Sequence, residues 1–407
     1  MCIRDRLVAP FRALIGFRSD THRSVLGWKR VPFIWLGTML QFGGLAIMPF
    51  ALILLTGTTT VQLVAGHVAA GLAFLLAGAG LQTTQTAGLA LATDLAPPAS
   101  RPRVVALMYV MLMLGMVGCG LLFSLLLAHY TPTRLVQVVQ GAAAATMLLN
   151  IVALWKQEPR RARCAAGAPV AAASGFNATW SRLVAHGRVI RFLVAVGLGT
   201  AAFNMQDIIL EPYGGEILHL PVGATTQLTA LMALGALVAF ALGARRLGRG
   251  ADAHRVAASG VLVGLLAFTA VIFAEPLDAP LLFRCGAVLI GFGGGLFSVG
   301  TLTAAMNLET GGLNGLALGA WGGVQATCAG VAIALGGALR DLVSQLATSG
   351  GLGEVLVSPG TGYSVVYQIE LALMFATLIA LGPLARRASS PARPTAQPAF
   401  ALNQRPS

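Results

Sequence analysis

Long apolar runs dominate this chain of 407 residues and restrict it to one broad class of fold. Several runs extend for about twenty residues or more, which is the length that an α-helix needs to cross the hydrocarbon core of a bilayer. Hydrophobic residues make up 56% of the sequence, charged residues make up 10%, and the mean hydropathy is +0.79. The sequence therefore predicts an all-α polytopic membrane protein.

The order of apolar and polar segments predicts ten spans in two unequal bundles. Residues 1–155 are expected to hold four spans, residues 156–188 a cytoplasmic linker, residues 189–387 a six-helix bundle, and residues 388–407 a disordered tail. The opening MCIRDR resembles no membrane segment and is expected not to be native. The predicted spans cover residues 31–56, 61–91, 104–128, 135–155, 189–210, 222–242, 256–273, 281–307, 313–339 and 363–384.

A short motif occurs once in each half of the chain, between apolar segments. The two copies are Gly16-x-x-x-Asp20-x-His22-Arg23 and Gly248-x-x-x-Asp252-x-His254-Arg255, at an offset of 232 residues. Each copy is expected to form a basic hairpin between two membrane helices. Repeats of half-protein length are typical of secondary transporters, in which two similar bundles enclose a site near the middle of the membrane.

The repeat also predicts a longer parent protein. The second half has six expected spans, whereas only four are expected in the first half, and only fifteen residues precede Gly16. We therefore expect two further helices upstream of Leu7 in the full-length protein, which would give twelve spans.

Basic residues predict the orientation of the chain in the membrane. The net charge is +13, and 24 of the 27 Lys and Arg residues fall in alternate connecting segments if the first hairpin is cytoplasmic. Because basic residues in short loops remain in the cytoplasm, both termini are expected there. The positive charge is thus explained by membrane topology, and no nucleic-acid partner is expected.

Known catalytic motifs are missing from the sequence. It contains no GxxxxGK[ST] phosphate loop, no nucleophile elbow and no HExxH, and its five cysteines show no spacing typical of metal ligands. These absences argue against an enzyme, a metal centre and a primary pump.

Three polar residues are expected on one helix face of the span at 189–210. They are Asn204, Asp207 and Glu211, spaced i, i+3 and i+7. An ionisable group inside a membrane is costly and marks a functional site. We therefore expect Asp207 and Asn204 to line a cavity, with Arg284 as an ion-pair partner at similar depth, although Arg284 is equally able to snorkel to the headgroups. Glu211 is expected to cap the helix at the membrane surface.

A second polar face lies on the span at 61–91. Gln82, Gln85 and Thr86 are spaced i, i+3 and i+4 among small residues. Such a face either packs helices together through hydrogen bonds or forms a polar wall for a substrate, and the spacing leaves both interpretations open. The only histidine within a predicted span is His67, near the outer end of the same helix.

The Gly16 motif resembles the loop between the second and third helices of the major facilitator superfamily, although Thr21 replaces the usual basic residue. Within that superfamily, LIGFRSDTHRSVLGWKRVPFIWLGT (residues 14–38), GLQTTQTAGLALATDLAP (80–97) and FNMQDIILEPYGGEIL (203–218) resemble the PucC/LhaA family of purple phototrophic bacteria. The likeness extends over most of the chain, and it implies a major facilitator-type fold with ten of its twelve helices present.

The family resemblance implies a role in assembling light-harvesting complexes in the bacterial inner or intracytoplasmic membrane. It implies bacteriochlorophyll as bound cargo without a covalent cofactor, and it implies membrane lipid, antenna polypeptides and pigment-synthesis or insertion machinery as partners. In this fold Glu370 would lie on the peripheral twelfth helix, where it would face a partner or pigment. The alternative is a proton-coupled exporter of a small hydrophobic solute that uses Asp207 as the proton carrier.

Overall fold

The fold is almost entirely helical, and its long helices match the predicted spans. The computed structural model describes residues 11–22, 27–57, 59–127, 131–158, 175–185, 187–308, 313–349, 358 and 360–387. Within these residues ten helical segments are long and apolar enough to cross a membrane, which confirms the predicted ten spans. The elements are α1 (Arg12–Thr21), α2 (Val31–Leu55), α3 (Thr60–Leu95), η3 (Pro98–Ser100), α4 (Arg101–Leu126), α5 (Pro132–Leu154), α7 (Phe176–Ala185), α8 (Gly187–Asn204), η4 (Met205–Ile208), α9 (Leu210–Glu216), α10 (Val222–Gly248), α11 (Ala253–Ala274), α12 (Pro280–Met306), α13 (Asn314–Thr348) and α14 (Thr361–Arg387).

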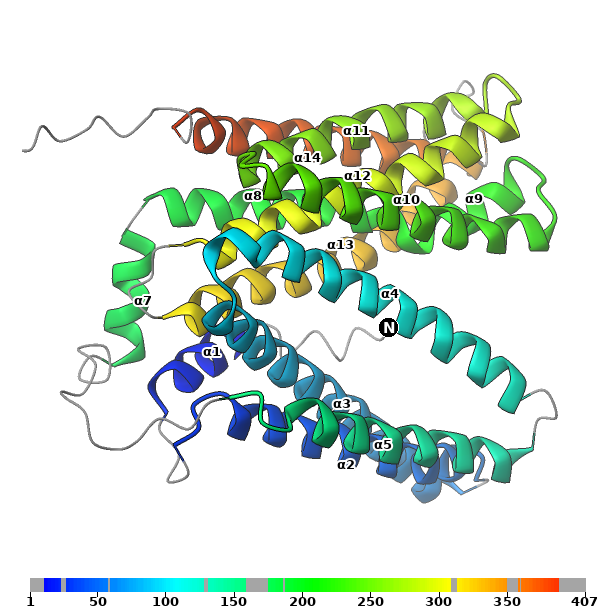
Figure 1. Ribbon diagram of the computed structural model, residues 1–407. Helices are drawn as coiled ribbons and strands as arrows, with labels where there is room; N and C mark the ends of the chain where they lie inside the picture. The colour runs from blue at the N-terminus through cyan, green and yellow to red at the C-terminus, as the bar shows by residue number, and fades with distance from the viewer. Residues whose placement is uncertain are drawn as a thin grey trace, which may run out of the picture.

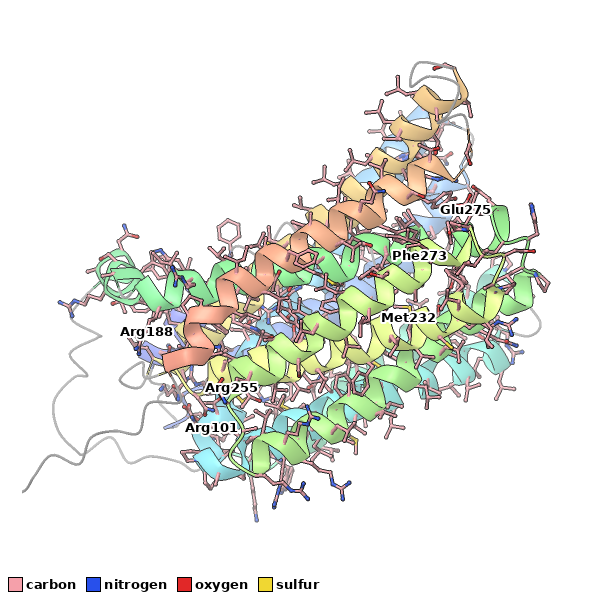
Figure 2. All side chains as sticks on the ribbon, turned by 90° about the horizontal axis from the view of Figure 1, so that it is seen from above. Arg101, Arg188, Met232, Arg255, Phe273 and Glu275 are labelled. Carbon is pink, nitrogen blue, oxygen red and sulfur yellow. The ribbon has the colours of Figure 1, made fainter. Side chains whose placement is uncertain are left out.

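The helices form two groups, which meet at one end and separate toward the other. Helices α1–α5 make the N-terminal bundle, and helices α8–α14 make the C-terminal bundle (Figure 1). The groups touch where α1 crosses α13 and where α4 packs against α10 and α12. Arg101, Arg188 and Arg255 all lie at one end of the molecule, which we call the basic end, and Glu275 lies at the far end (Figure 2).

The described part of the first copy of the repeated motif is mostly helical, whereas the whole copy was expected to lie in a hairpin. Gly16 and Asp20 lie inside α1, which continues to Thr21. The second copy is a turn, as expected. Gly248 is the last residue of α10, and the Asp252 side chain caps α11 by accepting a hydrogen bond from the backbone N–H of Arg255 at 3.0 Å. Arg23, which was predicted with the first copy, lies outside the described residues.

The expected linker contains a helix. Helix α7 is amphipathic, and its aromatic residues pack on the N-terminal bundle through an edge contact of 5.6 Å between the rings of Phe176 and Phe17. The predicted tail at 388–407 and the opening MCIRDR lie outside the described residues.

The span that carries Asn204 and Asp207 is interrupted. α8 ends at Asn204, η4 follows as a 3₁₀ turn, and α9 resumes the α-helix. Pro212 explains much of this break, because a proline has no N–H for the carbonyl four residues earlier, at Ile208, and its ring crowds that carbonyl. The Asn204 side chain also donates to the carbonyl of Thr200 at 2.7 Å. The prediction that Asn204, Asp207 and Glu211 share one continuous helix face is therefore wrong.

Candidate functional site

Two glycines allow α1 and α13 to cross in backbone contact at the basic end. A Cβ atom on Gly315 would lie 2.6 Å from the carbonyl oxygen of Gly16, and a Cβ on Gly16 would overlap the backbone of Gly315. Real side chains never approach a backbone so closely, so neither position accepts a larger residue without displacement of a helix. This crossing holds the two bundles together at one end.

Asp20 joins the bundles through the first turn of α13. Its carboxylate accepts hydrogen bonds from the backbone N–H groups of Gly315 at 3.0 Å and Leu316 at 2.8 Å. On the other side it pairs with the guanidinium of Arg30, whose side chain is fully buried, and Lys29 lies 3.9 Å away. Burial raises the pKa of the Asp20 carboxyl above its ordinary value, while Arg30, the two N–H groups and Lys29 oppose that rise.

Arg30 extends this junction to a second acidic residue. Its Nε donates to Asp94 Oδ2 at 3.1 Å, and its Nη1 donates to the Ser19 hydroxyl at 2.6 Å. The other oxygen of Asp94 accepts from the Asn314 side chain at 2.9 Å, so α3 also reaches α13. Glu158 accepts from the backbone N–H groups at the start of α2. We call Asp20, Arg30, Asp94 and their partners on α13 the junction network.

A second contact joins the two bundles at the same end. Arg101, at the start of α4, donates to the carbonyl of Met306 at 2.7 Å and to the Asn307 side chain at 3.0 Å. Asp252, the counterpart of Asp20 in the repeat, caps its own helix instead. The repeated sequence motif therefore produces a charged contact between bundles in one half only.

Arg12 occupies the interior between the bundles, two turns from Asp20 along α1. Its side chain is buried, Nε donates to the Thr86 hydroxyl at 3.0 Å, and Nη1 donates to the carbonyl of Gly322 at 3.1 Å. Within the described part of the chain, Nη2 has no hydrogen-bond partner and no carboxylate pairs with this guanidinium. A buried cation without a counter-ion is costly and attracts an acceptor or anion.

The predicted polar face of α3 splits in two. Gln82 and Thr86 are both buried, and Thr86 contacts Arg12, since its hydroxyl accepts from Arg12 and donates to the backbone carbonyl of Gln82 at 2.7 Å. The side-chain oxygen of Gln82 has no partner among the described residues. Gln85 is exposed. Arg12 was missed by sequence analysis, which counted it only among the basic residues of the first cytoplasmic segment, although its distance of eight residues from Asp20 places it about 12 Å along a helix.

Asp207 and Arg284 do not form the predicted ion pair. Asp207 is exposed and accepts a hydrogen bond from the side chain of Gln206 at 2.9 Å, and the ion pairs of the described residues do not include one with Arg284. The 3₁₀ turn removes Asp207 from the helix register on which the pairing was based. Glu211 is exposed, as a surface cap would be, and accepts from the Thr229 hydroxyl at 2.7 Å.

Glu370 faces the interior of the C-terminal bundle, not a partner outside it. Its side chain has no solvent exposure, and it lies within electrostatic range of Asp207 and the backbone of Gln206. Tyr363 and Tyr367 precede it on the same face of α14, at the spacing i, i+4 and i+7. The expectation that Glu370 meets a partner protein or pigment is therefore corrected. The reason is that this face of α14 packs on α8 and η4.

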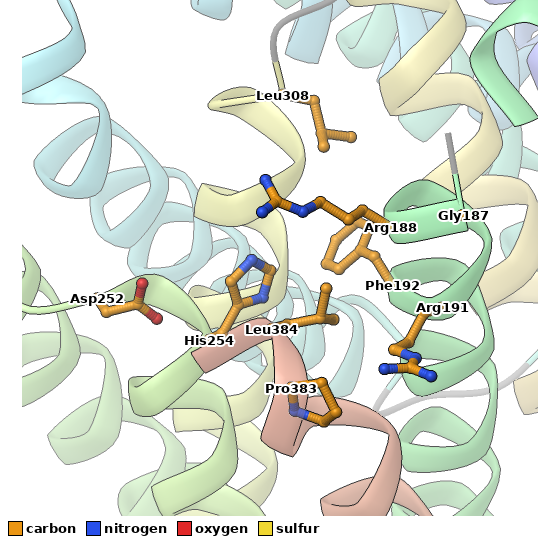
Figure 3. A pocket seen from close by; sticks show the side chains of 9 residues that line it. All are labelled: Gly187, Arg188, Arg191, Phe192, Asp252, His254, Leu308, Pro383 and Leu384. Atoms are coloured by element: carbon orange, nitrogen blue, oxygen red, sulfur yellow. The ribbon is translucent and has the colours of Figure 1, made fainter. Parts of the chain in front are cut away.

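A cavity of about 710 Å³ opens at the basic end of the C-terminal bundle (Figure 3). Arg188 and Arg191 come from α8, Asp252 and His254 come from the second copy of the motif, and Phe192 lies against the His254 ring at 5.7 Å. The second motif therefore lines a cavity, whereas the first closes a junction. Among the described residues no cluster of His, Cys, Asp and Glu is arranged to hold a metal ion, and His67 is exposed.

This arrangement of helices is that of the major facilitator superfamily. The chain superimposes on a bacterial homologue of the iron transporter ferroportin in its outward-facing state with a TM-score of 0.71, at 16% identity, over 95% of this chain and 88% of the other. It superimposes on the transporter FucP in its outward conformation with a TM-score of 0.66, over 95% and 89% of the two chains. These similarities establish the fold.

Residues 3–389 match the family model for the PUCC protein, and the chain belongs to that family. It is 53% identical to an uncharacterized protein of the puhA–bchM intergenic region of Rhodobacter capsulatus, over 94% of this chain and 80% of that protein. It is 48% identical to Protein PucC of Cereibacter sphaeroides, over 94% and 82%. It is 25% identical to a protein of Rhodobacter capsulatus named bacteriochlorophyll synthase 44.5 kDa chain, over 92% and 84%.

Proposed function

We propose that this protein is an assembly factor for the light-harvesting complexes of a phototrophic bacterium, in which it binds bacteriochlorophyll and delivers it to antenna polypeptides. Membership of the PUCC family is the observation that carries the proposal. The related protein named bacteriochlorophyll synthase 44.5 kDa chain adds a second association with the pigment. The site of action is the inner or intracytoplasmic membrane, with the basic end and both termini in the cytoplasm.

The interior between the bundles has the chemistry that a tetrapyrrole needs. A flat macrocycle with a hydrocarbon tail binds best to apolar walls with a few placed polar groups. Helix α4 offers apolar side chains for such a wall, because Leu112, Met116 and Leu121 are at least half exposed. Two buried polar groups in this region have no hydrogen-bond partner among the described residues. They are the Nη2 group of Arg12, a donor, and the side-chain oxygen of Gln82, an acceptor.

The polar contacts to the pigment are expected at these two side chains. The Nη2 group of Arg12 would donate to a carbonyl oxygen of the macrocycle, and Gln82 would contact a second polar group. The hydrocarbon tail would remain in lipid beside α4.

Deletion of the gene tests the assembly role. Antenna content should fall while synthesis of free bacteriochlorophyll continues, because delivery and biosynthesis are separate steps. The protein itself should copurify with bacteriochlorophyll or antenna polypeptides in mild detergent. Normal antenna levels in the deletion strain, with no related gene present, would refute the proposal.

A matched pair of variants tests the site. Gln82→Leu should lower the amount of copurifying pigment, whereas Gln85→Leu, on the exposed face of the same helix, should leave it unchanged. Equal pigment in both variants would exclude the Arg12 region as the binding site without affecting the assembly role measured by deletion.

A proton-coupled exporter is the second candidate function, favoured by the carboxyl groups of Asp207 and Glu370 beside the broken helix. Discontinuous helices near ionisable groups are typical of coupled transport sites. Uptake of protons by vesicles when a solute is added would support the exporter, whereas loss of antenna complexes alone would support the assembly factor.

A further inference from the structure

Glu370 lies deep inside the C-terminal bundle without a cation beside it. Its side chain is fully buried, and neither carboxyl oxygen makes a hydrogen bond of ordinary geometry with another described residue, although the backbone of Gln206 comes near. The hydroxyl of Tyr367, one turn earlier on α14, is also without a partner there. The surroundings of Glu370 on the side of α14 are therefore enclosed and weakly polar.

The cations of the surrounding helices are engaged elsewhere. Arg340 on α13 pairs with Glu216 and Asp341 and contacts the hydroxyl of Tyr363. Glu370 takes part in none of the ion pairs found in the described part of the chain.

The titratable groups that face Glu370 carry no positive charge. η4 contributes Asp207, which is acidic. The other groups are tyrosines: Tyr213 from α9 packs edge-on against Tyr367 with 5.4 Å between ring centroids, and Tyr363 lies one turn beyond. Glu275, after the end of α11, lies farther out, beside Gly360. The basic side chains of α8, Arg188 and Arg191, line the cavity at the basic end.

These surroundings decide the protonation state. An isolated carboxylate in a medium of low dielectric costs many kcal/mol, so a buried carboxyl without a cation takes up a proton instead. The acidic neighbour Asp207 adds to this preference, because two adjacent negative charges repel.

We propose that Glu370 is a proton-binding site of the C-terminal bundle, which holds a proton at neutral pH and exchanges it with the surface beside Asp207. Asp207 lies on the 3₁₀ turn with an exposed side chain, so it connects the buried carboxyl with the outside of the bundle. Release of the proton would leave a bare carboxylate between α14 and η4. The charged form therefore requires water to enter between these elements, which links proton release to their separation.

Infrared spectroscopy of the purified full chain in lipid nanodiscs tests this proposal. At neutral pH the protein should show the C=O stretching band of a protonated carboxylic acid, and Glu370→Gln should abolish it. Glu211→Gln, which changes an exposed carboxyl near the same break, is the matched control and should leave the band unchanged. If the amide variant does not fold, Glu370→Asp should move the band to a different frequency and so assign it.

Substitution of the neighbouring acid, Asp207, gives an independent test. In Asp207→Asn the titration midpoint of the band should shift to lower pH, because loss of the adjacent negative charge makes the ionised form of Glu370 less unfavourable. A wild-type spectrum without a protonated acid band at neutral pH would overturn the proposal. So would a band that persists unshifted in both Glu370 variants.

Discussion

Gly16 on α1 and Gly315 on α13 meet backbone to backbone across the two bundles, with no room for a side chain on either. Gly16 belongs to the first copy of the repeated motif. Its counterpart Gly248 has no atom within 4 Å of the position that a Cβ would occupy. The same residue in the two copies is therefore a packing requirement in one half and a surface position in the other.

Gly16→Ala should destabilise the protein by about 1–3 kcal/mol, because the added methyl group forces α1 away from α13. Gly248→Ala is the matched control and should change stability by less than about 0.5 kcal/mol. The midpoint of unfolding in denaturant, measured in detergent, compares the two variants. Equal midpoints would show that the helices do not cross at this glycine.

Asp20→Asn should cost about 3–5 kcal/mol, since it removes one partner of a buried ion pair and leaves Arg30 partly uncompensated. Combining Asp20→Asn with Arg30→Gln should be less than additive, as residues of one network are. Lys29→Met, which removes a partly exposed cation 3.9 Å from Asp20, should cost less than about 1 kcal/mol. A loss in Lys29→Met as large as that in Asp20→Asn would contradict the assignment of the pair to Arg30.

Asp207→Asn and Arg284→Gln should have additive effects on antenna assembly. The two side chains do not form an ion pair in this structure, and additivity is the rule for separate sites. A double-mutant cycle scored by antenna content measures the interaction. A double variant clearly less impaired than the sum of the single variants would show that the two groups do meet in the working protein.

A reporter enzyme that works only in the cytoplasm should be active when it is fused after Ser407. A reporter that works only in the periplasm should be inactive at the same position. The physical reason is the concentration of Lys and Arg in alternate connecting segments, which resist translocation. A second fusion in the turn after α11, near Glu275, should show the opposite activity. Periplasmic activity of the first fusion would reverse the proposed orientation.

Sequence patterns were sufficient for the fold because each span is specified locally, by a run of apolar residues long enough to cross a bilayer. The ten spans follow from that signal alone. The break in the helix at Met205–Ile208 was harder to predict from the sequence. Pro212 indicated a local end to the helix, but the 3₁₀ turn begins earlier, at Met205, where η4 packs so closely on α13 that a Cβ on Gly336 would overlap the carbonyl of Met205.

Side-chain partners were harder to predict than spans, because they depend on contacts between residues that are distant in the chain. Arg12 lies 310 residues from Gly322, to which it donates a hydrogen bond. Glu370 was assigned to the periphery from its helix, yet its orientation is set by which face of α14 packs inward. The spacing of Tyr363, Tyr367 and Glu370 was a usable signal, since three polar residues on one face of a membrane helix predict a face turned away from lipid.

The burial of the junction network has a consequence for the behaviour of the protein in different media. Mobile ions screen charges that face water, and they screen enclosed pairs much less. Arg30 is fully enclosed and Asp20 nearly so, whereas the contact of Arg101 at the same end involves a carbonyl and an amide, which carry no net charge. The contact between α1 and α13 at the basic end should therefore be equally stable in dilute and concentrated salt. It should weaken only when water itself penetrates between the two helices.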